Sequence, residues 1–350
     1  MSGRRVSWTL RIESRRSFLQ RGALTVAWAG LVACGGSENE TVTDPPVPSE
    51  GSDDEIVPVT IAGAITPNEL FYVTSCCGSP TVDIATWSLS IRSRGAELLA
   101  VAFDTLAALP AREKEHTLEC IGAGQANLAI SNAIWTGLPL PELFDAISVT
   151  VPAGTVELKF ESADGYSTSI PVEDLDKPVW LVWLMNGEPL PVDHGYPVRL
   201  LVPGRYGMKN PKWITSLDFV DVPYTGYSEQ RGWSNDASYQ TNALVHDPFT
   251  WDSVPAGEIV VSGTAFAGSD PIVSVELSVD GGAWAPAVLD YAPGPDIWTL
   301  WHFEVTLAEG NHTVQARCTT ASGATSGPES RGTNYLSGFG GSGEVQFDVV

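Results

Sequence analysis

Short runs of apolar residues, separated by turns rich in glycine, proline and polar residues, make up most of the chain after residue 55. Apolar and polar residues alternate over Leu89–Arg92 and Val156–Phe160, which predicts half-buried strands. The run Val179–Met185 (VWLVWLM) is apolar throughout and stops at Asn186-Gly187. It predicts a buried strand, and it is too short to span a membrane. Among a few helical stretches, Pro141–Ala146 (PELFDA) has the pattern of a short helix.

A second pattern begins near residue 246. The segments IVVSGTAF, VSVELSVDGGAW, LWHFEVTL and HTVQARCTT alternate at almost regular spacing, and Asp280-Gly281-Gly282 predicts a hairpin turn in one of them. We therefore predict an immunoglobulin-like all-β sandwich over residues 246–350. Its Cys318 has no plausible partner cysteine in that domain, which predicts a buried free thiol. With a mixed α/β domain over residues 58–245, the predicted fold class is α+β.

The first 33 residues have the pattern of an export signal and are not expected to be part of the fold. A basic stretch containing Arg15-Arg16 precedes a short apolar run, Ala23–Ala33. The paired arginines between Ser14 and Phe18-Leu19 resemble a twin-arginine signal, a route that exports folded proteins. A chance arginine pair in an ordinary secretory signal is the alternative.

The apolar run ends in Leu31-Val32-Ala33-Cys34, which resembles a bacterial lipoprotein box. Small residues before the cysteine suit the peptidase that cuts there, so Cys34 is the predicted lipidation site, and a chance cysteine is the alternative. Residues 34–57 that follow are acidic, rich in proline and serine, and without apolar periodicity. They predict a disordered linker that tethers the folded part to the membrane.

The chain is strongly acidic, with a formal net charge of −23. The leader holds six arginines and one glutamate, so its removal leaves 13 basic and 41 acidic residues and a net charge of −28. Such a surface repels nucleic acid and favours small ligands or basic protein partners. The five cysteines form neither a disulfide scaffold nor a haem or paired zinc motif.

The stretch TLECIGAGQA, residues 117–126, has two readings. Gly122-Ala123-Gly124 gives the start of a dinucleotide motif, but Asn127 stands where the third glycine belongs, and no long helix follows. The second interpretation is that Cys120, at the end of an apolar strand, does the chemistry. Glycines beside it would then give a bulky ligand room to approach the backbone. We prefer this interpretation.

A basic segment stands out in so acidic a chain. Arg199, Arg205, Lys209 and Lys212 fall within fourteen residues, after His194-Gly195. Arginine suits bidentate contacts with phosphate, and lysine supplies a point charge, so the segment predicts an anion site. The alternative is a structural loop with ordinary surface ion pairs.

Several of these segments together resemble the sulfite-oxidase family of molybdopterin-dependent oxidoreductases. The resemblance runs from about Phe71 to Trp233, through LEC, AISNAIWTGLPL, DGYSTSIPV, MNGEPLPVDHGYPVRLLVPGRYGMKNPKW and GYSEQRGW. The predicted sandwich corresponds to that family's C-terminal dimerisation domain, which leaves a homodimer open. The resemblance implies a molybdenum–molybdopterin cofactor.

The resemblance also assigns site residues. Cys120 falls on the cysteine that ligates molybdenum, and a soft thiolate suits a metal held by a sulfur-rich group. The remaining assignments are cofactor-binding: Tyr72, Asp164, His194, Arg199 and Lys212. The tyrosine near the metal corresponds to Trp233, with Tyr224 and Tyr227 as close alternatives.

Two departures from the family concern its substrate site. Thr74-Ser75-Cys76 stands where the family has Arg-Asn-His, and Ala123-Gly124-Gln125 stands where the sulfite oxidases have Asn-Arg-Arg. Both departures remove cations that an oxyanion substrate needs. We interpret Cys76-Cys77 as two small residues in a turn before Pro80, because adjacent cysteines rarely bond each other; a redox or metal-proximal role is the alternative.

The predicted function is a two-electron oxygen-atom transfer on a small substrate, carried out in the bacterial periplasm by a lipid-anchored enzyme. With no haem motif in the chain, electrons are expected to pass to a separate carrier such as a c-type cytochrome. One alternative is a reductase of sulfoxides or N-oxides, which fits the missing cations. The other is a non-catalytic lipoprotein that keeps the fold as an interaction module.

Overall fold

The computed structural model describes residues 8–10, 59–61, 64–327 and 337–350. The predicted linker and most of the predicted leader, with Cys34, lie outside the described residues. One short strand within the leader, β1 (Trp8–Leu10), pairs antiparallel with β2 (Val59–Ile61). This pairing differs from the expectation that the leader is not part of the fold. No described helix is long and apolar enough to cross a membrane.

Two five-stranded sheets form the half of the molecule that contains the candidate site. The first has the order β4-β3-β12-β7-β8, in which β12 runs parallel to β3 and antiparallel to β7. Its strands are β3 (Ser88–Ser93), β4 (Ala96–Ala102), β7 (Glu157–Ser162), β8 (Ser167–Pro171) and β12 (Ile214–Val220). The second has the order β10-β9-β6-β5, with β11 also paired to β9. Its strands are β5 (Arg112–Glu119), β6 (Ile130–Pro139), β9 (Trp180–Met185), β10 (Glu188–Pro189) and β11 (Arg199–Leu201).

The apolar run of β9 is explained by burial on both faces of its sheet. Leu181 and Trp183 pack into the core shared with the first sheet, whereas Trp180 and Val182 pack on the opposite face around Phe71. A strand covered on both sides has no polar face to alternate, so its sequence is apolar throughout. The prediction of a buried strand here is confirmed.

Helices are few in the described part of the chain. The two α-helices are α2 (Phe103–Ala107) and α3 (Leu140–Ala146), and five short 3-10 turns accompany them. Helix α3 confirms the predicted helix and buries Leu140, Leu143 and Phe144 against the first core. The 3-10 turns are η1 (Asn68–Leu70), η2 (Val172–Asp176), η3 (Val192–His194), η4 (Gly207–Lys209) and η5 (Glu229–Arg231). The fold is therefore mostly β-sheet, with less helix than a mixed α/β domain implies.

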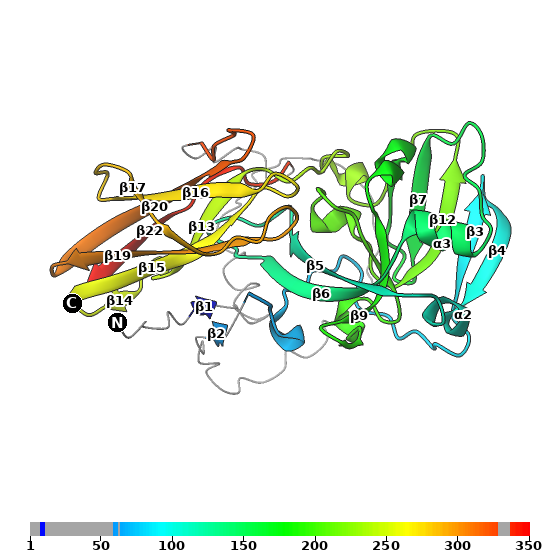
Figure 1. Ribbon diagram of the computed structural model, residues 1–350, viewed down its shortest axis with the longest axis horizontal. Helices are drawn as coiled ribbons and strands as arrows, with labels where there is room; N and C mark the ends of the chain where they lie inside the picture. The colour runs from blue at the N-terminus through cyan, green and yellow to red at the C-terminus, as the bar shows by residue number, and fades with distance from the viewer. Residues whose placement is uncertain (1–7, 11–58, 62–63, 328–336) are drawn as a thin grey trace, which may run out of the picture.

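Two further five-stranded sheets pack face to face in the C-terminal half (Figure 1). One contains β13 (Asn242–Asp247), β15 (Gly257–Phe266), β18 (Val288–Tyr291), β19 (Thr299–Leu307) and β21 (Gly341–Ser342). The other contains β14 (Ser253–Val254), β16 (Ile272–Val279), β17 (Ala285–Pro286), β20 (Gly310–Thr320) and β22 (Glu344–Val349). Val261 and Trp301 of one sheet share a core with Leu277 and Phe347 of the other. Cys318 is buried and free, as predicted.

The two halves meet at the end of β5 and along β13. Strand β13 begins before the predicted domain boundary at 245/246, and it belongs to the C-terminal sandwich because it pairs with β15. Thr117 on β5 accepts a hydrogen bond from the Trp298 backbone N–H at 2.9 Å. The turn that follows β5 therefore lies between the candidate site and the sandwich.

Candidate active site

One cavity of about 310 Å³ opens beside the end of β5. Its lining includes all six residues that the sequence assigns to the cofactor: Tyr72, Cys120, Asp164, His194, Arg199 and Lys212. These residues come from five separate segments of the chain, and the fold brings them together. Their individual roles stay predictions.

Cys120 is held by the backbone of the turn after β5. Its N–H donates to the Ala129 carbonyl at 2.9 Å, and its own carbonyl accepts the Ala123 N–H at 2.8 Å. Burial and the neighbouring Glu119 raise the thiol pKa, although contacts with Gly122 and with the Thr74 hydroxyl oppose the rise. A thiol in this setting becomes a thiolate readily only when a cation binds it. A Cβ added at Gly122 would lie 3.9 Å from the Cys120 sulfur, which is ordinary contact, so that glycine is not required by packing inside the protein.

Glu119 lies directly before Cys120 and is fully buried. Burial raises its pKa to about 8, and the only opposing contribution is the Asn242 amide, which donates to its carboxyl oxygens at 3.0 and 3.2 Å. Glu119 is therefore largely protonated at neutral pH. It adds a negative charge beside the thiol, and so raises the thiol pKa, only once it ionises at higher pH.

Arg199 and Lys212 supply positive charge on one wall of the cavity. The Arg199 guanidinium donates to the His194 carbonyl at 3.1 Å and to the Asn210 carbonyl at 3.2 Å, and its buried Nε has no partner within the protein. The Lys212 ammonium donates to the Asp193 carbonyl at 2.8 Å. Burial lowers the pKa of Arg199 to about 10, which leaves it charged at neutral pH.

The other two cations of the basic segment, Lys209 and Arg205, lie outside the cavity lining. Lys209 is buried and pairs with Glu229, and it also donates to the Ser169 carbonyl at 2.9 Å. Arg205 pairs with Asp174 at 2.6 Å. Neither residue lines the cavity. The prediction of one four-cation anion site is therefore wrong for Arg205 and Lys209, which form structural ion pairs, while Arg199 and Lys212 remain candidates.

Gly195 permits the close approach of Arg199 and Lys212. Its φ is +113°, and an added Cβ would lie 3.0 Å from the Arg199 Cβ and 3.1 Å from the Lys212 Cβ. His194 beside it bonds through Nε2 to the Asn68 carbonyl oxygen at 2.8 Å. Burial, followed by the two cations, lowers the pKa of His194 to about 4, and the contact with Asn68 opposes that shift. His194 is therefore neutral at pH 7 and serves as a hydrogen-bonding group.

Tyr227, an alternative for the tyrosine near the metal, lines the cavity, and so do Tyr166 and Arg231, which had no role assigned from the sequence. The Arg231 guanidinium lies over the Tyr227 ring at 3.4 Å and donates to the Tyr227 carbonyl at 2.6 Å. Trp233 also lines the cavity, but Tyr224 does not; its hydroxyl lies 2.8 Å from the Ser167 hydroxyl. The signal that could have revealed Arg231 was its place in GYSEQRGW, a segment already recognised as similar to the family.

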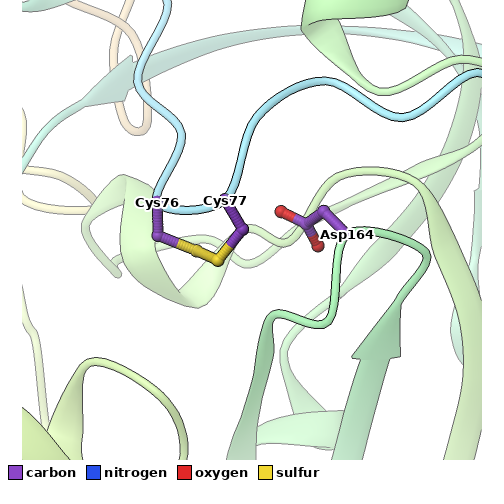
Figure 2. Close-up of side chains that lie close together, drawn as sticks. All are labelled: Cys76, Cys77 and Asp164. Carbon is purple, nitrogen blue, oxygen red and sulfur yellow. A yellow bond between two sulfur atoms is a disulfide. The ribbon is translucent and has the colours of Figure 1, made fainter. Parts of the chain in front are cut away.

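Cys76 and Cys77 are bonded to each other, which overturns their interpretation as an unpaired turn. Both are exposed, and Cys76 lines the cavity. Asp164 lies beside them, with a carboxyl oxygen within 4.8 Å of both sulfurs (Figure 2). Because the two sulfurs share a bond, they offer no thiolate, and this group is not a metal site in its oxidised form.

The cavity residues fit an anion that carries a soft metal. One thiol stands at the end of β5, two cations and a neutral histidine stand on the opposite segment, and the buried Arg199 Nε is a donor without a protein acceptor. A phosphate oxygen satisfies such a donor, and thiolate is the ligand class that binds soft or sulfur-rich metal centres. The residues present therefore fit a molybdenum–pterin group.

Comparison with known proteins gives the same assignment. Residues 77–228 match the model of the oxidoreductase molybdopterin binding domain. The chain is 27% identical over 303 residues to the mitochondrial sulfite oxidase of Homo sapiens, covering 73% of this chain and 55% of that protein. It is 30% identical over 295 residues to the sulfite oxidase of Gallus gallus, covering 70% and 64%. It is also 24% identical over 310 residues to the nitrate reductase (NADH) 2 of Phaseolus vulgaris, covering 71% and 35%.

A solved structure shares the fold. The crystal structure of the sulfane dehydrogenase SoxCD from Paracoccus pantotrophus superposes with a TM-score of 0.70 at 23% identity, covering 81% of this chain and 84% of that one. The chain spans about half the length of the mammalian sulfite oxidases that it matches. Together with the six assigned residues around one cavity, these similarities support a molybdopterin-binding oxidoreductase that is similar to the sulfite oxidases.

Proposed function

We propose that this protein catalyses a two-electron oxygen-atom transfer on a small substrate, with Cys120 ligating molybdenum. The observation that carries the proposal is the convergence of the six assigned residues on one cavity, from segments as far apart as Tyr72 and Lys212. Chance would not bring the residues of a dispersed motif to one place. When bound, the molybdenum cofactor supplies the redox centre for oxygen-atom transfer.

The protein's own residues prepare the cavity for such a group. Cys120 presents one sulfur from a turn fixed by two backbone hydrogen bonds. Arg199 and Lys212 counter the charge of an anionic cofactor, and His194 offers a neutral ring in the same cavity. Tyr72 lines the same cavity, and burial raises the pKa of its hydroxyl well above its usual range, so it remains a hydrogen-bond donor. Asp164 accepts the Tyr166 N–H at 2.9 Å and completes the lining.

The residues on the cavity wall around Arg231 favour an oxidase that acts on a small anion over a reductase that acts on neutral oxides. The cations missing at two of the family's motifs favour a neutral substrate. Arg231, however, places another guanidinium on the cavity wall, beside Tyr227 and Trp233. A cation at the mouth of a cavity attracts an anionic substrate and orients it.

We propose that the enzyme acts in the bacterial periplasm, exported by the twin-arginine route and anchored through a lipid on Cys34. The arginine pair and the lipoprotein box support this location. A separate electron carrier, such as a c-type cytochrome, accepts the electrons. The C-terminal sandwich is proposed to be of immunoglobulin-like type and to provide a dimer contact.

The test is molybdenum and pterin analysis of protein purified from cells that make the cofactor, followed by turnover assays. We expect about one molybdenum and one pterin per chain, with oxidation of sulfite in preference to reduction of methionine sulfoxide. A Cys120→Ser variant should stay folded and lose the thiolate contribution to the metal's absorption spectrum. A Cys318→Ser variant is the control, since that thiol is buried in the sandwich.

Each outcome separates one candidate from the others. Protein without molybdenum from such cells would support the non-catalytic lipoprotein. Full molybdenum content with turnover of methionine sulfoxide alone would support the reductase. An unchanged absorption spectrum in the Cys120→Ser variant would contradict the ligand assignment.

A further inference from the structure

The bonded pair Cys76–Cys77 lies at the mouth of the candidate cavity, on the loop that follows Tyr72. The loop is held by Ser75, whose hydroxyl donates to the Gly78 carbonyl at 2.6 Å and accepts the Cys77 N–H at 3.4 Å. Both cysteines are exposed, and Cys76 lines the cavity. Exposed disulfides are the ones that react with sulfur nucleophiles, because attack requires access along the sulfur–sulfur bond.

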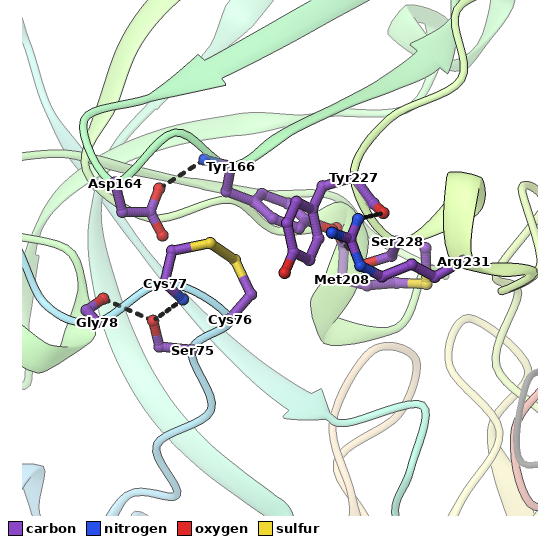
Figure 3. Close-up of a disulfide and its surroundings, with 10 residues drawn as sticks. All are labelled: Ser75, Cys76, Cys77, Gly78, Asp164, Tyr166, Met208, Tyr227, Ser228 and Arg231. Carbon is purple, nitrogen blue, oxygen red and sulfur yellow. Dashed lines mark hydrogen bonds between the residues drawn. A yellow bond between two sulfur atoms is a disulfide. The ribbon is translucent and has the colours of Figure 1, made fainter. Parts of the chain in front are cut away.

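The two cysteines of the disulfide face different neighbours, although the Asp164 carboxylate lies within 4.8 Å of both sulfurs. Cys77 lies toward Asp164, whose carboxylate is fixed by the Tyr166 N–H at 2.9 Å (Figures 2 and 3). Cys76 lies toward Tyr227 and Arg231, whose guanidinium covers the Tyr227 ring (Figure 3). An anion that approaches from the Cys76 side therefore meets the attraction of Arg231, which offsets the repulsion by Asp164 there.

We propose that Cys76–Cys77 is a covalent capture site for an anionic sulfur nucleophile, such as sulfite or thiosulfate, at the mouth of the cofactor cavity. The nucleophile's sulfur forms a bond to the Cys76 sulfur, and the Cys76–Cys77 bond breaks. The electron pair of the broken bond passes to the Cys77 sulfur, which takes a proton from water. The disulfide is itself the oxidant in this exchange, so no further reagent is needed.

The position of Arg231 sets the direction of the attack. Arg231 attracts the incoming anion to the sulfur that faces the cavity, which places the captured group beside the other lining residues. Asp164 disfavours a second negative charge on the Cys77 sulfur, which slows its release and keeps it protonated once it is released. Because only a thiolate attacks a disulfide efficiently, this carboxylate slows the reverse reaction and prolongs the captured state.

The role of the site rests on the proposed function, because the captured sulfur is held where that function needs a substrate. The capture step itself needs no metal. It is therefore tested on metal-free protein with its disulfide intact, which is treated with sulfite, with thiosulfate and with a neutral trialkylphosphine, which attacks a disulfide without carrying a negative charge. Remaining thiols are then alkylated, and the intact mass and the peptide masses are measured.

We expect a mass increase of one sulfite per chain, with the sulfonate on Cys76 and the alkyl group on Cys77; thiosulfate should form the corresponding adduct. An Arg231→Gln variant should react several-fold more slowly with sulfite, while its reaction with the neutral phosphine stays the same. Cys76→Ser and Cys77→Ser variants lack the disulfide and should form no adduct, and circular dichroism checks that they fold.

An adduct on Cys77, no adduct at all, or an equal sulfite rate in the Arg231→Gln variant would overturn the proposal. These results are distinct from a failure of the proposed function. Capture on Cys76 in a protein that never binds molybdenum supports the site and contradicts the enzyme. Sulfite oxidation by molybdenum-loaded protein whose disulfide never reacts supports the enzyme and overturns the capture site.

Discussion

The side chain of Gln125 bonds both backbone groups of Val245. Its amide nitrogen donates to the Val245 carbonyl at 2.6 Å, and its carbonyl oxygen accepts the Val245 N–H at 2.9 Å. Gln125 belongs to the turn after Cys120, and Val245 belongs to β13 of the sandwich. The position that the resemblance aligns with an arginine of the sulfite oxidases is therefore used here to join the two halves of the molecule.

Replacing Gln125 with alanine should destabilise the protein by about 1–3 kcal/mol, because two backbone groups of Val245 lose their partners. A fall in the midpoint of urea unfolding measures the change. A Gln346→Ala variant is the matched control, since that side chain is exposed. A Gln125→Arg variant should also be less stable and should not gain sulfite affinity; a stable variant with a lower KM for sulfite would refute this account.

The buried Glu119 predicts a pH dependence of stability. Its pKa is about 8 in the folded protein, above the ordinary value near 4.5 that applies when the chain is unfolded. Between these values the folded state holds a proton that the unfolded state has released, so stability falls as pH rises from about 4.5 to about 8. A Glu119→Gln variant should have a flatter curve and gain on the order of a few kcal/mol relative to wild type near pH 8. Unfolding of metal-free protein at several pH values is the measurement, and parallel curves for the two proteins would contradict the assignment.

Removing one charge of the buried Lys209–Glu229 pair should lower the stability of the protein without removing a residue that lines the cavity. A Lys209→Met variant leaves the Glu229 carboxylate buried without its cation and should lose about 3–5 kcal/mol. The double variant Lys209→Met/Glu229→Leu removes both charges and should recover most of this loss. Thermal unfolding measures both. A single variant as stable as wild type would show that the pair has no structural role.

The lack of a side chain at Gly195 should be necessary for full cofactor content. A Gly195→Ala variant forces a side chain between Arg199 and Lys212 at a positive φ, so the two cations must move apart. We expect a lower pterin content and a loss of stability of about 1–3 kcal/mol. Gly187→Ala is the matched control, since its φ is +80° and an added Cβ meets nothing within 4 Å. Equal pterin content in the two variants would contradict the role of crowding.

Much of the fold could be predicted because it follows from local patterns. The strand around VWLVWLM, helix α3 and the alternating C-terminal strands all lie where apolar periodicity places them. The start of the sandwich could not be predicted as well. Strand β13 lies in a stretch without clear alternation of apolar and polar residues. Five of its six residues are buried where the strand pairs with β15, so it has no exposed polar face to reveal it.

Less of the candidate site than of the fold could be predicted from the sequence. A motif identifies residues such as Arg199 and Lys212, but it does not say which neighbouring cations have partners. Lys209 and Arg205 look equivalent to them in the sequence, yet Glu229 and Asp174 engage them from other segments. Likewise, the bond between Cys76 and Cys77 depends on the conformation of one loop, and residue spacing carries no information about it.

Glu119 and Cys120 are neighbours on one strand end that face different parts of the molecule. The first contacts Asn242 of the sandwich, and the second lines the cavity. Binding of any ligand that orders this strand end is then coupled to docking of the sandwich, and thermodynamic reciprocity requires each event to strengthen the other by the same factor. Cofactor insertion and assembly of the two halves would thus form a single cooperative event.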